Sequence, residues 1–157
     1  EENARLKSRA VAAFTGLPSL ADDSGLVVDA LGGRPGIYSA RYAGEGCSYA
    51  DNNAKLLQEL QGVPQEKRTA RFIAVMVLTM PDGRERVAEG CCEGYITADP
   101  RGEAGFGYDP VFVPEGYDKT FAELGAEIKN RISHRAKALK KMAAIINAEC
   151  EMQSAEA

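Results

Sequence analysis

Two adjacent carboxylates stand in the segment Ala21-Asp22-Asp23-Ser24-Gly25. Neighbouring side chains at the end of a strand point to opposite sides, so Asp22 and Asp23 can take different roles. One can face a ligand or a metal ion while the other anchors the loop. Two acids this close repel each other, which favours a cation or a shared proton between them. Asp, Ser and Gly are also common in tight turns, and the motif alone favours a turn at Ser24-Gly25 without a chemical role over a functional site, by about two to one.

A second cluster, Gly105-Phe106-Gly107-Tyr108-Asp109-Pro110, combines aromatic rings with two glycines. The glycines let the backbone approach a flat ligand closely, and Phe106 or Tyr108 can stack on a nucleobase. The alternative is a structural loop whose aromatic side chain plugs the core. The spacing is not that of a dinucleotide-binding fingerprint, which also requires a preceding strand and a following helix.

The third cluster joins Lys129 to Ser133-His134-Arg135. Ser133 is a candidate N-cap, which places His134 and Arg135 in the first turn of a final helix. Free backbone N–H groups there favour an anion or a carbonyl oxygen. Basic side chains at that end oppose the helix dipole, so their presence calls for a reason. The alternative is a solvated basic face of the helix.

Hydrophobic periodicity predicts the elements that must position these clusters. Helices are expected over residues 1–14, 51–61, 122–129 and 134–148, and strands over residues 20–22, 70–80 and 86–96. The last helix is expected to present to the core Ala136, Leu139, Met142, Ala143 and Ile146. Lys7 lies on the first helix and matters only if that helix faces the same pocket as Asp23. The order of elements predicts an α/β domain with a mixed or twisted sheet.

The composition is that of an ordinary globular domain, with 45% apolar and 27% charged residues in 157. A net charge of −4 argues against a surface for long nucleic acid but not against a small anionic ligand. No apolar run is long enough to cross a bilayer, and no signal peptide is visible. The four cysteines form no C-x-x-C pair, which predicts free thiols in a reducing cytosol. A single histidine excludes a His-rich metal site and leaves Mg²⁺ held by carboxylates.

Taken together, the clusters resemble the inosine triphosphate pyrophosphatase family, whose members remove ITP, dITP and XTP. The resemblance covers essentially the whole chain, from residue 2 to about residue 146, and each motif alone is weak. Five motifs occur in family order: Glu2-Asn3-Ala4 with Lys7, Asp22-Asp23-Ser24-Gly25-Leu26, Pro35-Gly36-Ile37-Tyr38-Ser39-Ala40-Arg41-Tyr42, Phe106-Gly107-Tyr108-Asp109-Pro110, and Ser133-His134-Arg135. The resemblance implies Mg²⁺-dependent hydrolysis of a nonstandard purine nucleoside triphosphate to the monophosphate and pyrophosphate. It also implies a cytoplasmic homodimer, with a twisted sheet flanked by helices and two lobes around a central cleft.

The resemblance further implies a role for each site residue. Asp23 is implied to be the general base and a Mg²⁺ ligand, with Asp22 supporting it at the metal. Ser24 and Lys7 are implied to contact the phosphates. Phe106 is implied to stack on the purine, and the wall of the base pocket is implied to be formed by Gly107, Tyr108 and Asp109. Near the 6-keto oxygen of the base, the resemblance implies Lys129, His134 and Arg135.

The sequence departs from the family pattern before its first helix. The family begins with a strand and a Ser/Thr-x-Asn-x-x-Lys loop that grips the triphosphate, followed by an acidic metal-site residue. We therefore expect one domain over residues 1–150 without that strand and phosphate loop, and a disordered tail over residues 151–157. Two alternative functions follow: a non-catalytic nucleotide-binding fragment, or an aspartate-dependent phosphatase with Asp22 or Asp23 as nucleophile. The phosphatase lacks its usual D-x-D pattern.

Overall fold

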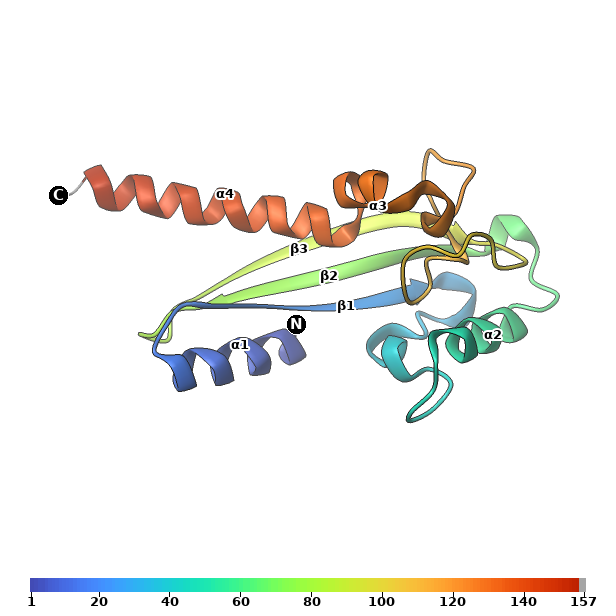
Figure 1. Cartoon of the computed structure of the whole chain (residues 1–157), viewed down its shortest axis with the longest axis horizontal. Coiled ribbons are helices and arrows are strands. Elements are labelled where there is room, and N and C mark those ends of the chain that lie inside the picture. Colours follow the sequence, from blue (N-terminus) through green and yellow to red (C-terminus); the bar gives the residue numbers. More distant parts are fainter. Residues whose placement is uncertain (156–157) are drawn as a thin grey trace.

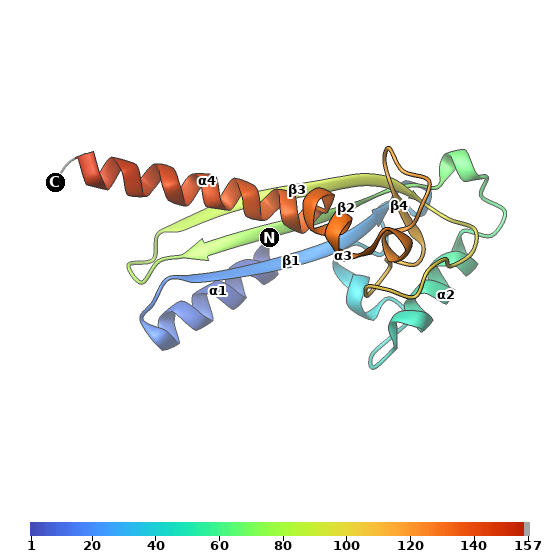
Figure 2. The ribbon, with the colours of Figure 1, turned by 45° about the horizontal axis from the view of Figure 1, so that its top comes forward.

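The computed structural model of the chain describes residues 1–155 and contains one four-stranded sheet. The strands follow chain order across the sheet: β1 (Ser19–Val28), β2 (Thr69–Thr79), β3 (Glu85–Ile96) and β4 (Phe112–Pro114). Every neighbouring pair is antiparallel, so the α/β class is confirmed while the sheet is antiparallel instead of mixed. The three long strands lie side by side and curve together toward the end that carries β4 (Figure 2).

Helices cover both faces of the sheet. The helices are α1 (Glu2–Thr15), α2 (Tyr49–Glu59), α3 (Phe121–Ile132) and α4 (His134–Ala155). Short 3-10 turns are η1 (Asp29–Leu31), η2 (Gly36–Arg41) and η3 (Gln65–Lys67). Figure 1 shows α3 and α4 above the sheet and α1 and α2 below it. The helices and the two long central strands thus agree with the sequence expectations, whereas β4 was not predicted.

The segment predicted as a turn at Ser24-Gly25 is instead the middle of β1, which pairs with β2 through ten consecutive residues. A Cβ atom on Gly25 would lie 2.6 Å from the carbonyl oxygen of Gly36. Gly25 therefore allows the backbone of η2 to approach the strand, and this close approach, not a turn, accounts for the glycine. Ser39 completes the contact, because its Oγ accepts a hydrogen bond from the Leu26 N–H at 2.9 Å.

The buried face of α4 differs from the prediction. Ala138 and Met142 are fully buried, whereas Leu139 is 50% exposed. A Cβ atom on Gly90 would lie 2.0 Å from the carbonyl oxygen of His134 and 2.5 Å from the Ala138 nitrogen. The helix α4 therefore packs directly on the backbone of β3, and this close contact determines which residues of α4 are buried. The backbone of α4 runs past the predicted end to Ala155, and the last two residues of the predicted tail, 156–157, lie outside the described residues.

Two apolar clusters form the core. The larger cluster lies between β1, β2, α2 and α3, and its fully buried side chains include Leu26, Leu56, Leu60, Ile96 and Phe112. The smaller cluster lies under α4 and includes Ala74, Met76 and Met142. Among the described residues, no helix is long and apolar enough to span a membrane.

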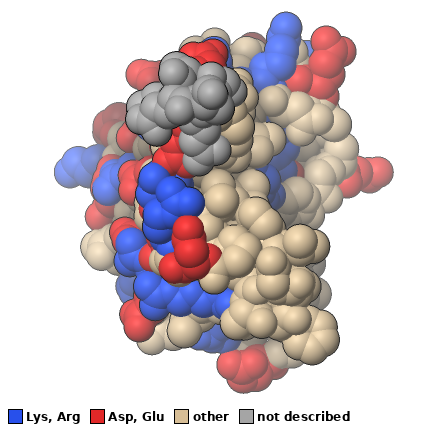
Figure 3. All heavy atoms as spheres, turned by 90° about the vertical axis from the view of Figure 1, so that its left-hand side faces the viewer, with Lys and Arg blue, Asp and Glu red and all other residues tan. Residues whose placement is uncertain are grey.

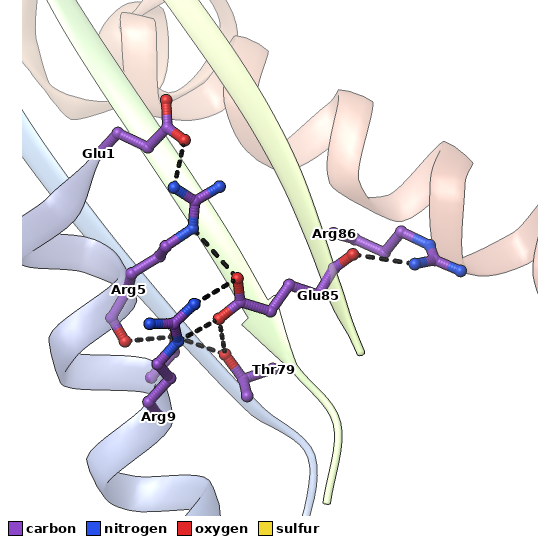
Figure 4. A network of polar contacts seen from close by, with 7 residues as sticks. Glu1, Arg5, Arg9, Thr79, Glu85 and Arg86 are labelled. Atoms are coloured by element: carbon purple, nitrogen blue, oxygen red, sulfur yellow. Dashed lines mark hydrogen bonds and ion pairs between the residues drawn. The ribbon is translucent and has the colours of Figure 1, made fainter. Parts of the chain in front are cut away.

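Glu85, the first residue of β3, anchors α1 to the sheet (Figure 4). Its carboxylate accepts hydrogen bonds from Arg9 at 2.7 Å and from Arg5 at 3.0 Å, and these bonds, the one from Arg9 most, hold the pKa of Glu85 below its usual range. Beneath this pair, the hydroxyls of Ser8 and Thr79 are hydrogen-bonded at 2.7 Å. Charges of both signs are intermixed at this end of the molecule (Figure 3). These contacts fix α1, the helix that presents Lys7 to the cavity described below.

Side chains from α4 cover the outer edge of β3. Lys137 donates to the Cys91 carbonyl at 2.9 Å and Lys141 to the Glu89 carbonyl at 2.7 Å. Further along the same edge, the Glu115 N–H donates to the Glu93 carbonyl at 2.9 Å. Carbonyls two residues apart on a strand point the same way, so these three contacts bind successive acceptors of one edge.

Candidate functional site

A cavity of about 320 Å³ opens between β1, the Gly-rich loop and the start of α4. It brings together every residue that the sequence analysis assigned to a site: Lys7, Asp22, Asp23, Ser24, Phe106, Gly107, Tyr108, Asp109, Lys129, His134 and Arg135. These residues come from five separate segments of the chain. Only the sheet topology and the packing of α1 and α4 on opposite faces make them neighbours.

The two carboxylates of β1 point to opposite faces of the sheet, as alternation along a strand requires. The Asp22 carboxylate receives hydrogen bonds from Arg135 of α4, with Nη2 and Nε at 2.8 and 2.9 Å from Oδ2. The Asp23 carboxylate faces α1, where Asn3 Nδ2 lies 3.3 Å from Oδ2 and Lys7 Nζ lies 3.5 Å from Oδ1. Because the two carboxylates face different partners, the geometry allows them to take different roles, as expected. They lie within β1, however, and not at the end of a strand as the sequence analysis assumed.

Lys7 reaches the same cavity as Asp23, which was the condition for assigning it a role. Its ammonium group also donates to the backbone carbonyl of Asp22. The amine is half exposed, so it keeps hydrogens for a ligand. On the neighbouring position of β1, the Ser24 hydroxyl is buried and has no hydrogen-bond partner within the described residues. An unpaired buried hydroxyl at a cavity is available to a ligand oxygen.

The Gly-rich loop is held by the carboxylate of Asp109. This buried side chain accepts a hydrogen bond from the Phe106 N–H at 2.9 Å and forms an ion pair with Lys129. A Cβ atom on Gly105, whose φ is +84°, would lie 2.1 Å from Asp109 Oδ2. The loop therefore needs glycine at that position both for its backbone conformation and for space. Tyr108 adds a second tie through its hydroxyl, which donates to the Ser39 carbonyl at 2.8 Å.

The loop leaves Phe106 at the cavity with 51% of its surface exposed. Lys129 Nζ lies 4.0 Å from its ring centroid and the Arg135 guanidinium carbon lies 6.0 Å away. The sequence left two alternatives for this loop, an aromatic plug of the core and a ring that stacks on a ligand, and its two aromatic residues correspond to one alternative each. Tyr108 is the buried plug, and Phe106 is the exposed ring that a flat ligand can reach.

His134 begins α4 and lies buried against Phe72 of β2. Burial, together with the positive charges of Arg135 and Lys129, lowers the pKa of His134 to about 4, although Asp22 opposes the shift. The imidazole is therefore neutral at pH 7, with one ring nitrogen as donor and the other as acceptor. Its buried Nδ1 has no hydrogen-bond partner in the described part of the chain. Of the two basic residues at the start of α4, His134 is thus neutral and the positive charge of Arg135 is paired with Asp22. Neither therefore leaves an unpaired positive charge at the positive end of the helix dipole.

Three side chains in or beside the cavity bear on the site although the sequence analysis gave them no role: Phe72 and Tyr49 line it, and Asn3 contacts Asp23 next to it. In the sequence, Asn3 is part of a motif, Phe72 belongs to the apolar run of β2, and Tyr49 opens α2. Phe72 could not be distinguished from an ordinary core residue in the sequence, because β2 contributes side chains both to the core and to the cavity. Tyr49 carries no pattern signal at all, since a single aromatic residue at the start of a helix has no preferred function.

The residues present fit a Mg²⁺ ion held through one carboxylate, since Mg²⁺ commonly binds one or two protein carboxylates together with substrate phosphates. Asp23 is the suitable ligand, because its partly exposed carboxylate opens into the cavity. Asp22 is engaged with Arg135 on the opposite face of β1, so the two acids do not converge on one ion. Among the described residues, no group of three or more His, Cys, Asp or Glu side chains could hold a metal alone.

The arrangement separates two kinds of chemistry within one cavity. At one end, Lys7 and Asp23 offer a cation and a carboxylate that can bind phosphate and position water. At the other end, Phe106 offers an aromatic face, and His134 and Arg135 offer hydrogen-bond donors. Arg135 uses Nε and Nη2 for Asp22, which leaves Nη1 for a ligand. A nucleotide, which joins a flat base to phosphate, matches this division.

Comparisons with known proteins agree with this assignment. The family model described as the Ham1 family matches residues 1–145. A protein named dITP/XTP pyrophosphatase from Desulforamulus reducens is 58% identical over 146 residues, which cover 93% of this chain and 73% of the relative. The Bacillus subtilis protein of the same name is 52% identical over 148 residues, covering 94% and 75%. The solved Ham1 protein of Staphylococcus aureus superposes with a TM-score of 0.88 at 46% identity, covering 94% of this chain and 76% of that one.

Proposed function

Because this chain belongs to the Ham1 family, we propose that it hydrolyses nonstandard purine nucleoside triphosphates, such as ITP, dITP and XTP, to the monophosphate and pyrophosphate. The observation that carries the proposal is the single cavity that holds Asp23 and Lys7 together with the exposed ring of Phe106. Relatives named dITP/XTP pyrophosphatase support the same reaction class. Mg²⁺ is the proposed cofactor, with Asp23 as its protein ligand.

The proposed reaction is attack of water on the α-phosphorus, with pyrophosphate as the leaving group. The triphosphate is strongly anionic, so charge must be neutralised before water approaches, and the bound Mg²⁺ supplies part of that neutralisation. Lys7 supplies another part from α1. The Asp23 carboxylate orients the water and accepts its proton, a contribution typically worth about 10²–10⁴-fold in rate. Ser24 contributes its unpaired hydroxyl to a phosphate oxygen.

Base selection is assigned to the end of the cavity around Arg135. Hypoxanthine and xanthine carry an oxygen at position 6, whereas adenine carries an amino group there. A free Arg135 donor binds the oxygen but faces another donor in ATP, and an unpaired buried donor costs about 1–3 kcal/mol. The neutral His134 ring and the Lys129 amine border the same space. Phe106 stacks on the purine, while Gly107, Tyr108 and Asp109 wall its side.

Product analysis tests the proposal. The full chain is incubated with ITP and Mg²⁺, with ATP and metal-free reactions as controls, and the products are separated. The expected products are IMP and pyrophosphate, with little product from ATP or without metal. Binding without turnover would favour a non-catalytic nucleotide-binding module, and release of inorganic phosphate would favour an aspartate-dependent phosphatase.

Family membership also motivates two proposals about the protein in the cell. We propose that it acts in the cytoplasm on the free nucleotide pool and that it forms a homodimer. Sedimentation equilibrium tests the second proposal directly, since a mass of one chain across the concentration range contradicts it. Fractionation of the source cells tests the first.

A further inference from the structure

Tyr49 is a large aromatic residue at the cavity that no motif accounts for. It is the first residue of α2, its side chain is 57% exposed, and it lines the cavity of Asp23. Its ring centroid lies 6.5 Å from that of Phe106, with an angle of 47° between the planes. Phe106 borders a second cavity beside α3, and Tyr49 does not line that one. The contact between the two rings therefore belongs to the cavity with the carboxylates.

The position of Tyr49 is fixed by the elements on either side of it. Ser48 caps α2, and its side chain and that of Asp51 form a reciprocal capping box. One turn after Tyr49, the Asn53 amide donates to the Gly107 carbonyl at 3.0 Å. Residues four apart lie on the same face of a helix, so Tyr49 and Asn53 both face the Gly-rich loop. The loop that presents Phe106 and the helix that presents Tyr49 are thus joined to each other.

The spacing of the two rings suits a flat ligand. Carbon atoms in contact lie about 3.5 Å apart, so a base between two aromatic rings needs centroids about 7 Å apart. The observed 6.5 Å is close to this separation, and both side chains are more than half exposed, so they can rotate to close the 47° between their planes around a base. Aromatic rings stack on bases through their faces, which makes the contact tolerant of base identity.

We propose that Tyr49 is a second aromatic contact for the purine, which it holds together with Phe106. This inference rests on the proposed function for the identity of the ligand and adds a residue to its binding site. Asp23 and Lys7 then act at the phosphates, while the two rings fix the base at the other end of the cavity. Tyr49 adds affinity for any purine, and discrimination stays with the donors of Arg135 and His134.

The test measures equilibrium binding of IMP, which the proposed reaction forms and does not consume. Dissociation constants are determined by calorimetry for the full unsubstituted chain and for Tyr49→Ala, Tyr49→Phe and Tyr38→Ala. Tyr38 is the matched control, because it is 54% exposed but lies outside the cavity, near Arg41. Loss of one stacked ring corresponds to a dissociation constant raised about tenfold. Thermal unfolding of each variant verifies that the fold is retained.

The expected result is a dissociation constant raised about tenfold in Tyr49→Ala and unchanged within twofold in Tyr49→Phe and Tyr38→Ala. Equal affinity of Tyr49→Ala and the unsubstituted chain overturns the proposal, as does a complete absence of IMP binding to the unsubstituted chain. An equal loss in Tyr38→Ala also overturns it. Failure of ITP hydrolysis with the expected IMP affinities counts against the proposed reaction alone, so the two failures are distinguishable.

Discussion

His134 lies flat against Phe72, with their ring centroids 4.7 Å apart and an interplanar angle of 14°. Burial in this position and the nearby positive charges lower the pKa of His134 to about 4. Because the chain contains one histidine, its imidazole signals in a proton NMR spectrum need no assignment. A titration of the folded protein is expected to give an apparent pKa near 4. A value near the ordinary 6.5 contradicts the buried, neutral ring.

The same shift predicts loss of stability in acid. The unfolded chain binds a proton at His134 near pH 6.5 and the folded chain only near pH 4, so stability is full above pH 6.5 and falls as the pH drops to 4. The loss from this residue is at most about 3 kcal/mol. Urea unfolding across this range measures it, with His134→Gln as the control that should reduce the dependence and leave only the part due to carboxylates such as Glu85. Equal slopes for both chains would refute the assignment.

Substitution of Asp23 by Asn should remove the proposed general base without removing its volume. We expect kcat for ITP to fall by about 10²–10⁴-fold, with an unchanged unfolding midpoint. Asp22→Asn is the matched neighbour, which weakens the pair with Arg135 and so raises KM more than it lowers kcat. Pyrophosphate release at several ITP concentrations separates the two effects. Near-normal turnover in Asp23→Asn would reassign the base.

Removal of the Phe106 ring should weaken binding of the base more than it slows the chemical step. Phe106 is exposed at the cavity and is not among the buried core residues, so Phe106→Ala should leave the unfolding midpoint nearly unchanged. We expect KM for ITP to rise by about tenfold and kcat to change less, as for a lost stacking contact. Steady-state kinetics measures both constants. An unchanged KM would show that the ring does not contact the substrate.

The Gly-rich loop can be tested through Gly105. In Gly105→Ala the new methyl group collides with Asp109, which must release Phe106 or Lys129 to move. Gly116→Ala is the matched control, because Gly116 has a φ of +83° but no atom within 4 Å of an added Cβ. Both variants lose about 1–3 kcal/mol from backbone strain. We expect only Gly105→Ala to lose additional stability and to raise KM, measured by urea unfolding and kinetics. Equal losses of stability in the two variants, with KM unchanged in both, would mean that the Asp109 side chain moves aside without a free-energy cost.

The sequence predicts the long elements and the site residues because both leave local signals. The apolar run of β2 and the capping residue Ser133 are read from neighbours in the chain. The continuity of β1 through Gly25 depends on the approach of Gly36, which no local pattern reveals. In the same way, Ala138 is buried in place of Leu139 because Gly90 lets the backbone of α4 approach β3 closely. Contacts between distant segments therefore account for most of the differences.

The site shows the same division. Lys129, His134 and Arg135 are recognised as chemically unusual from their types and positions, and the fold brings all of them to one cavity. Phe72 and Tyr49 are ordinary aromatic residues in the sequence, and only the fold places their rings beside those of His134 and Phe106. A motif search finds residues whose chemistry is unusual, whereas residues that act by contact alone require the three-dimensional arrangement.

The lysines that bind the edge of β3 restrict how copies of this protein can associate. A strand from another molecule that paired there would have to displace the Lys137 and Lys141 amines from the carbonyls they bind. Exposed strand edges are the usual templates for fibrous aggregation, and lysine on an edge opposes it. While α4 is folded, a concentrated solution is thus protected from sheet polymerisation at this edge. Detachment of α4 would have to come first.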